Sequence, residues 1–185
     1  DICLKHNVLV VSDEIHSDFT YGENIHHVFA SLDEKYAAIT TTCTAPSKTF
    51  NIAGLQISNI WISNPELRAR FRAEGYSQVN LMGLVACQAA YETGEEWLKE
   101  LKIYLEGNLD YVRTFLKENL PEIKLTEPEG TYLLWLDFKS LGMKEEQLKD
   151  LVENKAKLWL DSGAMFGPDG EGFERINIAC PREIL

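Results

Sequence analysis

Cysteines and long hydrophobic runs are both scarce in this sequence. It has four cysteines in 185 residues, and no two of them form a C-x-x-C pair. Scattered thiols of this kind are typical of a reducing compartment and do not indicate a zinc site. No apolar run approaches the roughly 20 residues that span a bilayer, and no basic segment followed by an apolar stretch opens the chain. We therefore expect a cytoplasmic protein.

Positive charge is the next shortage. The sequence has 18 lysines and arginines against 29 aspartates and glutamates, a formal net charge of −11. An acidic surface repels the phosphates of nucleic acids and the headgroups of anionic membranes. Hydrophobic residues make up 45% of the chain and aromatic residues 10%, which is typical of a globular protein and excludes a disordered chain. We expect neither a nucleic acid nor a membrane as partner.

Strand-like and helix-like segments alternate along the chain, which is typical of an α/β fold. Short β-branched runs predict buried strands, and apolar residues at three- and four-residue steps predict helices. The predicted strands are Leu4–Ser12, Ala37–Thr42, Gln56–Ser63, Thr131–Phe138 and Glu174–Ala179, with Leu158–Leu160 as a short strand or a last helical turn. The predicted helices are Glu66–Ala73, which can begin at Pro65, Val79–Glu92, Glu95–Leu120 and Glu145–Lys155. The first 63 residues differ in chemistry from the end of the chain, which predicts domains of residues 1–105 and 106–185.

Acidic residues follow directly on the first predicted strand, in Ser12-Asp13-Glu14-Ile15-His16. Ligands of doubly wound sheets gather at the carboxyl ends of the strands. Asp13 can hold a cationic ring nitrogen there, and His16, three residues on, can point the same way. The alternative is an acidic loop in which Asp13 or Glu14 caps a helix.

A lone lysine follows the second predicted strand. Lys48 lies among small polar residues and outside any charge run, in TAPSKTFN. An amine in such a place can form a Schiff base if its pKa is lowered. The hydroxyls of Thr44, Ser47 and Thr49 beside it can receive a phosphate. A surface lysine in a hydroxyl-rich turn is the alternative.

An arginine lies on the last predicted strand. Arg175 and Asn177 share one face of an alternating segment, and Ile176 and Ile178 share the other. An inward arginine suits a bidentate grip on a carboxylate. The alternative is an edge-strand arginine in solvent. The pair His26-His27 has no third ligand at a suitable spacing, so we expect no metal site.

Together and in this order, four segments resemble a known superfamily. VVSDEIHSDF, TAPSKTFNIAGLQ, EGTYLLWLDF and FGPDGEGFERINIACPRE are similar to the fold-type I, pyridoxal-5′-phosphate (PLP) dependent aminotransferases of class I and II, and most of all to the cystathionine β-lyase, or C–S lyase, branch. The resemblance implies that residues 1–105 are the C-terminal part of a large PLP-binding domain with a mostly parallel, doubly wound sheet. Residues 106–185 would then be a smaller α+β C-terminal domain, truncated at its end.

The resemblance also implies roles for single residues. Lys48 matches the lysine that forms the Schiff base with PLP and shuttles the α-proton, and Asp13 matches the acid that pairs with the pyridinium nitrogen. His16 stands near the cofactor's phenolic oxygen, and Ser47 is a phosphate contact. Arg175 matches the arginine that binds the α-carboxylate of a small amino-acid substrate. Gly130 and Gly167 are backbone positions of the small domain, and the intact protein is expected to be a homodimer.

Two positions depart from the family pattern, and so does the length. Many aminotransferases have an arginine where this chain has Gln56, and often a serine where it has Ala45. The family's chain is about twice as long, and its N-terminal half brings further contacts to the phosphate and the ring. We expect this chain to be the C-terminal half and to be inactive by itself.

Three functions are compatible with this pattern. The resemblance favours β-elimination on sulfur amino acids, which yields pyruvate, ammonia and a thiol. Transamination by a class I/II aminotransferase would use the same residues. A third alternative, of another class, is the ligand-sensing aminotransferase-like domain of a transcription regulator, which would carry an N-terminal winged-helix domain.

Overall fold

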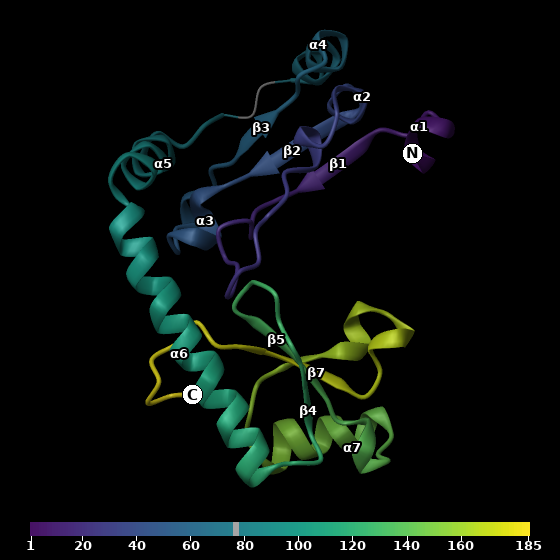
Figure 1. The fold of residues 1–185 in the computed structure, drawn as a ribbon, viewed down its shortest axis with the longest axis vertical. Helices are drawn as coiled ribbons and strands as arrows, with labels where there is room; N and C mark the ends of the chain where they lie inside the picture. The colour runs from purple at the N-terminus through teal and green to yellow at the C-terminus, as the bar shows by residue number, and fades with distance from the viewer. Residues whose placement is uncertain (76–77) are drawn as a thin grey trace. The chain divides into compact units, whose positions relative to one another are not determined.

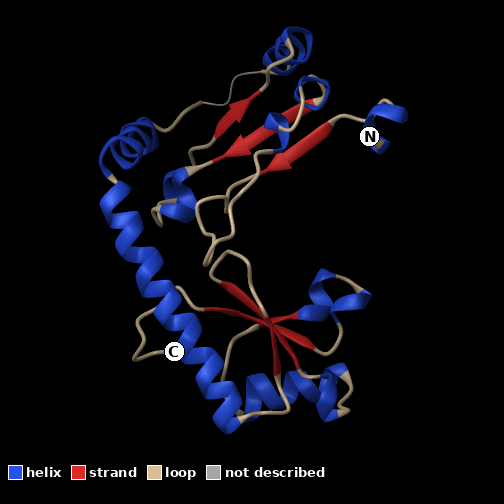
Figure 2. Cartoon of the chain, in the orientation of Figure 1, coloured by secondary structure: helices blue, strands red, loops and turns tan. Residues whose placement is uncertain are grey.

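The chain divides into two compact units, each with its own sheet (Figure 1). This computed structural model describes residues 1–75 and 78–185. The units are Asp1–Lys99 and Glu100–Leu185, and the division falls inside the long helix α6 (Glu95–Asn119). Helices and strands alternate in both units (Figure 2), so the chain has the expected α/β fold.

The first unit contains a three-stranded sheet of order β1-β2-β3. Strands β1 and β2 are parallel, with Val10 opposite Thr40 and Asp13 opposite Cys43, whereas β3 is antiparallel to β2. The strands are β1 (Val10–Asp13), β2 (Thr40–Thr44) and β3 (Asn59–Trp61). The helices are α1 (Ile2–Lys5), α2 (Glu34–Ala37), α3 (Pro46–Thr49), α4 (Pro65–Ala73) and α5 (Leu81–Thr93), with 3₁₀ turns η1 (Phe29–Ser31) and η2 (Ala53–Leu55).

The strand predictions for this unit were right in place and wrong in extent. The start of the predicted strand Leu4–Ser12 lies in helix α1 and a turn, and the predicted strand Ala37–Thr42 begins only at Thr40, after α2. One of the two pairings is antiparallel, so these three strands do not form the mostly parallel sheet that was expected. Val11 is 71% exposed, so β1 is not buried on both faces within this chain.

Side-chain caps fix where helices α4 and α5 begin. The side chain of Asn64 accepts hydrogen bonds from the amides of Glu66 and Leu67, which starts α4 at Pro65 as predicted. Asn80 caps α5 in the same way through the amide of Met82. Each cap satisfies amides that a helix leaves unpaired in its first turn.

The second unit contains an antiparallel four-stranded sheet of order β4-β5-β7-β6. Helix α6 buries one face of its length in this unit, with Leu105, Asn108, Leu109, Val112 and Leu116 inside. The strands are β4 (Lys124–Thr126), β5 (Leu133–Asp137), β6 (Asp161–Ser162) and β7 (Phe173–Asn177). The helices are α7 (Glu145–Lys149), the π-helix η4 (Asp150–Lys155), and the 3₁₀ turns η3 (Lys139–Leu141), η5 (Gly163–Phe166) and η6 (Pro168–Gly170).

The predictions for this unit were right for the two central strands and the helices. The predicted strands Thr131–Phe138 and Glu174–Ala179 correspond to β5 and β7. Leu158–Leu160 is neither a strand nor a helical turn, because the edge strand β6 starts one residue later, at Asp161. The short strand β4 had no signal in the sequence, since its burial pattern is largely exposed. None of the helices in the described part of the chain is long and apolar enough to cross a membrane.

A fully buried asparagine anchors the segment that follows β7. Asn108 on α6 donates hydrogen bonds to the carbonyls of Ile178 (2.8 Å) and Cys180 (3.0 Å), and its carbonyl accepts from Nε of Arg182 (3.0 Å). Gly107 makes room for the same arginine, because a Cβ there would lie 2.5 Å from Nη2 of Arg182. The buried amide therefore fixes the path of the chain beyond the last strand.

We predict that Asn108→Ala lowers the free energy of unfolding of the intact protein by about 2–3 kcal/mol, because it leaves the buried carbonyl of Ile178 and the partly buried carbonyl of Cys180 without donors. Urea unfolding measures this change. Asn119→Ala, at the exposed end of the same helix, is the matched control and should change stability by less than about 0.5 kcal/mol. Equal effects of the two substitutions would contradict the role assigned to Asn108.

Candidate active site

The parallel pairing of β1 and β2 brings three of the predicted residues to one edge of the sheet. Asp13 is the last residue of β1 and lies opposite Cys43 near the end of β2. Burial, and then the negative charge of Asp13, raise the pKa of the Cys43 thiol. Helix α3 begins two residues after β2 and carries Ser47 and Lys48. Asp13, Ser47 and Lys48 therefore all lie at the carboxyl edge of this parallel pair, where ligands of α/β sheets bind.

Helix α3 is short but firmly anchored. Pro46 and Thr49 are buried, whereas Lys48 is exposed. The Thr49 hydroxyl donates a 2.6 Å hydrogen bond to Oδ2 of Asp18, in the segment that follows β1. The sequence allows the Thr49 hydroxyl as a phosphate contact, but this hydroxyl is buried and already bound, so Thr49 is structural. The anchor holds the turn that presents Lys48.

Asp13 and its neighbour Glu14 play opposite parts. Asp13 is exposed, and its Oδ1 accepts a hydrogen bond from the amide of Ile15 (3.2 Å). Glu14 is 6% exposed and accepts from the Ser12 hydroxyl (2.9 Å) and the Phe29 amide (3.1 Å). The outward acid is thus available to a ligand, and the inward acid is part of the fold.

Glu14 also binds His26, with 2.9 Å between Oε2 and Nε2. Burial alone would raise the pKa of Glu14, but the hydrogen bonds from His26, Phe29 and Ser12 outweigh burial and leave that pKa below its ordinary value. The sequence pattern does not indicate this role, since an acid beside a strand end does not reveal a partner twelve residues away. In residues 1–75 and 78–185, no group of three or more His, Cys, Asp or Glu side chains is placed to hold a metal ion.

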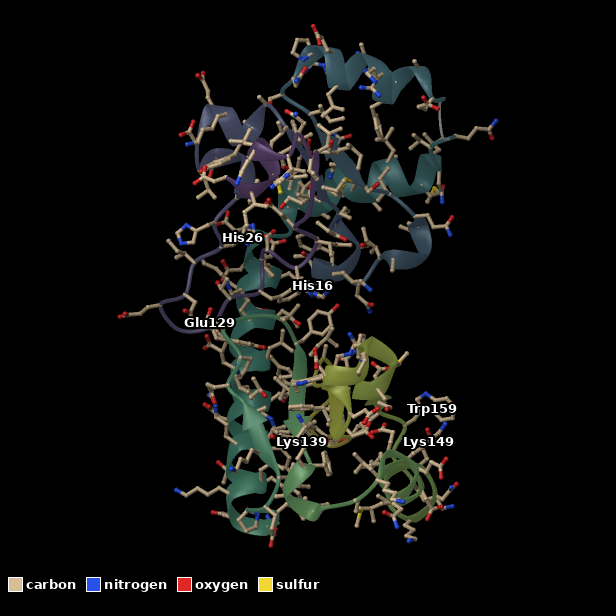
Figure 3. The ribbon with its side chains drawn as sticks, turned by 90° about the vertical axis from the view of Figure 1, so that its right-hand side faces the viewer. His16, His26, Glu129, Lys139, Lys149 and Trp159 are labelled. Carbon is tan, nitrogen blue, oxygen red and sulfur yellow. The ribbon has the colours of Figure 1, made fainter. Side chains whose placement is uncertain are left out.

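His16 lies beyond the end of β1 on the same segment as His26, as Figure 3 shows. It is half-buried, and its ring lies 6.4 Å from that of Phe19 at 51°. His16 therefore follows Asp13 at the carboxyl end of the strand.

Arg175 belongs to the second unit. It lies on β7 opposite Trp135 of β5 and Asp161 of β6. Its Nε and Nη2 donate to Oδ2 of Asp161 at 3.1 and 2.7 Å. Its guanidinium carbon lies 4.6 Å from the ring centre of Phe166. Arg175 is therefore held by a carboxylate and an aromatic ring, and it is not the free edge-strand arginine of the alternative interpretation.

The opposite face of β7 carries a buried acid that the sequence pattern did not single out. Glu174 is 2% exposed. Burial raises its pKa to about 7, with further contributions from the negative charges of Glu145, Glu153 and Asp161. Glu145 itself accepts hydrogen bonds from the Ser162 hydroxyl (2.5 Å) and the Gly172 amide (3.1 Å). This environment therefore stabilises the protonated form of Glu174 up to about pH 7.

The donor set at the sheet edge fits PLP in part. Lys48 offers an amine, Asp13 a carboxylate and Ser47 a hydroxyl, which are the groups that an aldehyde, a protonated ring nitrogen and a phosphate require. The arginine that many aminotransferases have for the phosphate is replaced by Gln56, whose backbone is left-handed (φ +52°). The chain therefore offers an amine for the aldehyde, a carboxylate for the ring nitrogen and one hydroxyl for the phosphate.

The match to a sequence family now adds to the geometry. A lysine and an aspartate at one sheet edge of an α/β chain agree with the resemblance that the sequence shows. Residues 1–184 match the family described as aminotransferase class I and II, and the chain belongs to this family.

Three similar proteins illustrate the relationship. Cystathionine beta-lyase PatB of Bacillus subtilis is 45% identical over 184 residues, which are 97% of this chain and 48% of that protein. The crystal structure of cystalysin from Treponema denticola, which contains a pyridoxal 5′-phosphate cofactor, has a TM-score of 0.94 at 42% identity and covers 100% of this chain and 48% of that one. The PLP-bound C–S lyase from Staphylococcus hominis has a TM-score of 0.90 at 37% identity, with 99% and 48% coverage. The chain thus spans about half the length of the relatives it matches.

We predict that Glu174→Gln stabilises the protein above neutral pH. A carboxyl whose pKa is raised by folding contributes its full stability below its ordinary pKa near 4.5 and loses it as the pH rises through about 7. Glutamine stays neutral, so the stability gain should grow from pH 5 to pH 8. We expect it to reach about 1–3 kcal/mol, because each tenfold change in a proton-binding equilibrium is worth about 1.4 kcal/mol.

Urea unfolding of the intact protein across this pH range measures the gain. Glu171→Gln, at an exposed glutamate three residues earlier, is the control and should show no such trend. A gain from Glu174→Gln that is the same at pH 5 and pH 8 would show that Glu174 is ionised at both.

Proposed function

We propose that this chain is the C-terminal half of a PLP-dependent C–S lyase that acts on sulfur amino acids such as cystathionine. The observation that carries the proposal is the 45% identity with a cystathionine beta-lyase along 97% of the chain. The arrangement of Asp13, Ser47 and Lys48 at one sheet edge supports it. Residues 1–105 would belong to the large cofactor-binding domain and residues 106–185 to the small domain.

Each site residue has a definite task in this proposal. Lys48 is the amine that carries the cofactor and, once the substrate amine has displaced it, moves the proton from the substrate α-carbon. Asp13 accepts a hydrogen bond from the protonated ring nitrogen and keeps it charged. His16 lies near the phenolic oxygen, and Ser47 donates to the phosphate. Arg175 binds the α-carboxylate and so fixes the direction of the α-hydrogen.

PLP, when bound, supplies an electron sink for the pair left at the α-carbon. Loss of the sulfur from the β-carbon as a thiol, followed by hydrolysis, gives pyruvate and ammonia. The same residues would serve transamination, and the family name includes aminotransferases. A cytoplasmic location and a homodimeric assembly belong to the proposal as well.

One experiment separates the two reactions. The intact protein is given L-cystathionine in one assay and 2-oxoglutarate with an amino donor in another. We expect pyruvate and a thiol in the first and little glutamate in the second. Glutamate without thiol would assign the protein to the aminotransferases, and bound PLP without any product would favour the ligand-sensing alternative.

We predict that Lys48→Ala abolishes the visible absorbance of the bound cofactor and all turnover, because alanine has no amine that can form a Schiff base with the cofactor's aldehyde. Spectra of the purified, dialysed protein measure this. Lys5→Ala, at another exposed lysine of the same unit, should leave both unchanged. A Lys48→Ala protein that keeps the absorbance band would refute the assignment.

We predict that Asp13→Asn lowers turnover by roughly 100-fold or more, the scale of a lost charge-stabilising group, while the protein still binds its cofactor. The reason is that asparagine cannot stabilise the positive charge on the ring nitrogen. Steady-state rates and cofactor content are the two measurements. Glu23→Gln, an exposed carboxylate in the segment after β1, is the control, and turnover of the Asp13 variant within twofold of wild type would contradict the role.

A further inference from the structure

Arg175 is held on two sides before any substrate arrives. One oxygen of Asp161, Oδ2, accepts from both Nε and Nη2 of the guanidinium at 3.1 and 2.7 Å. The ring of Phe166 covers one flat side, with its centre 4.6 Å from Cζ. Both side chains of the ion pair keep some exposure, 31% for Arg175 and 42% for Asp161, so the pair lies at the surface of its unit.

These contacts leave one edge of the guanidinium available. A guanidinium has five N–H groups, and a carboxylate can bind two of them side by side. Asp161 occupies the edge formed by Nε and Nη2. Within residues 1–75 and 78–185, Nη1 makes no hydrogen bond. The edge formed by Nη1 and the second hydrogen of Nη2 is therefore the one that an incoming carboxylate meets.

The residues that hold Arg175 are themselves fixed. Asp161 is in β6, directly opposite Arg175 in the register, and its neighbour Ser162 donates a 2.5 Å hydrogen bond to Glu145. Gly163 follows and lies so close to the backbone of Gly170 that a side chain at either position would clash. Phe166 ends the same turn, η5, and packs edge-on against Trp135 at 5.7 Å. These contacts thus hold the short segment from Asp161 to Phe166 in place beside Arg175.

We propose that Asp161 is a positioning residue for substrate binding: it turns the guanidinium of Arg175 so that the edge formed by Nη1 and Nη2 receives the substrate's α-carboxylate. This inference rests on the proposed function, in which Arg175 binds that carboxylate. Asp161 itself touches neither the substrate nor the cofactor. Its contribution is to the affinity for amino acids and not to the chemical step.

Two effects of Asp161 oppose each other. Its negative charge weakens the attraction of Arg175 for a carboxylate, by an amount that is small for a partly exposed pair. Its hydrogen bonds remove the rotational freedom of a long side chain, which would otherwise be lost on binding. If positioning dominates, removing the charge weakens substrate binding. If Asp161 competes with the substrate, removing the charge strengthens it.

The test compares two ligands that differ only in the carboxylate. L-Alanine and ethylamine are titrated into the intact, cofactor-loaded protein, and the absorbance of the bound cofactor reports occupancy. We expect Asp161→Asn to raise the apparent Kd for L-alanine about three- to tenfold, equivalent to about 0.7–1.4 kcal/mol, and to leave ethylamine within twofold. Asp169→Asn, at an exposed aspartate in η6, is the matched control and should change neither. An L-alanine Kd that is unchanged or lower in Asp161→Asn overturns the proposal.

A further variant separates this proposal from the function on which it rests. Arg175→Lys should weaken L-alanine more than Asp161→Asn does, since lysine offers no bidentate edge. An unchanged L-alanine affinity in Arg175→Lys would refute the role of Arg175, whatever Asp161 does. If Asp161→Asn does not fold, as judged by circular dichroism, Asp161→Glu keeps the charge but displaces the carboxylate. It should also weaken L-alanine selectively, and the opposite result counts against positioning.

Discussion

The parallel pairing of β1 with β2 is the constraint on which the candidate site depends. Parallel strands end at the same edge of a sheet, so the register from Val10–Thr40 to Asp13–Cys43 places the carboxyl ends of β1 and β2 side by side. Strand β1 ends in an outward acid, Asp13, and the segment after β2 carries Lys48 on a single short helix. A slip of one residue would turn Asp13 inward and Glu14 outward, since side chains alternate along a strand.

Buried polar contacts hold the segments that carry the site. Glu14 forms hydrogen bonds with Ser12, His26 and the Phe29 amide, and these bonds fix the long connection between β1 and α2. The Thr49–Asp18 bond fixes α3 against the same connection. In the second unit, Asn108 fixes the path of the chain after β7, and β7 is the strand that carries Arg175. None of these residues has a proposed role in catalysis or binding. Each of them holds a segment that lies next to a residue with such a role.

The two units use their acids differently. Around β1, the acidic side chains are either solvated or fully hydrogen-bonded, and the pKa of Glu14 is lowered. Around β7, Asp161 is paired with Arg175, but Glu174 is buried beside other carboxylates, and its pKa is raised to about 7. The acidic residues behind the net charge of −11 therefore have different environments in the two units. Below about pH 7 that acid is protonated, which lowers the cost of burying it on the second sheet.

Local pattern in the sequence was enough for the fold class, the long helices and the residues with candidate chemistry. Apolar periodicity predicted α5 and α6, and a proline suited to a helix start predicted α4. Asp13, Lys48 and Arg175 stood out because their neighbours are small, apolar or alternating. The resemblance to PLP enzymes rested on the same contiguous segments, and the family match agrees with it. What the sequence could not determine depends on contacts between distant segments. The extent of β1 and β2, the antiparallel direction of β3, the pairing of Glu14 with His26 and the grip of Asp161 on Arg175 are all of this kind. Hydrogen bonds between residues 12 or 14 positions apart leave no periodic trace in a sequence, because only the folded chain brings their atoms within about 3 Å.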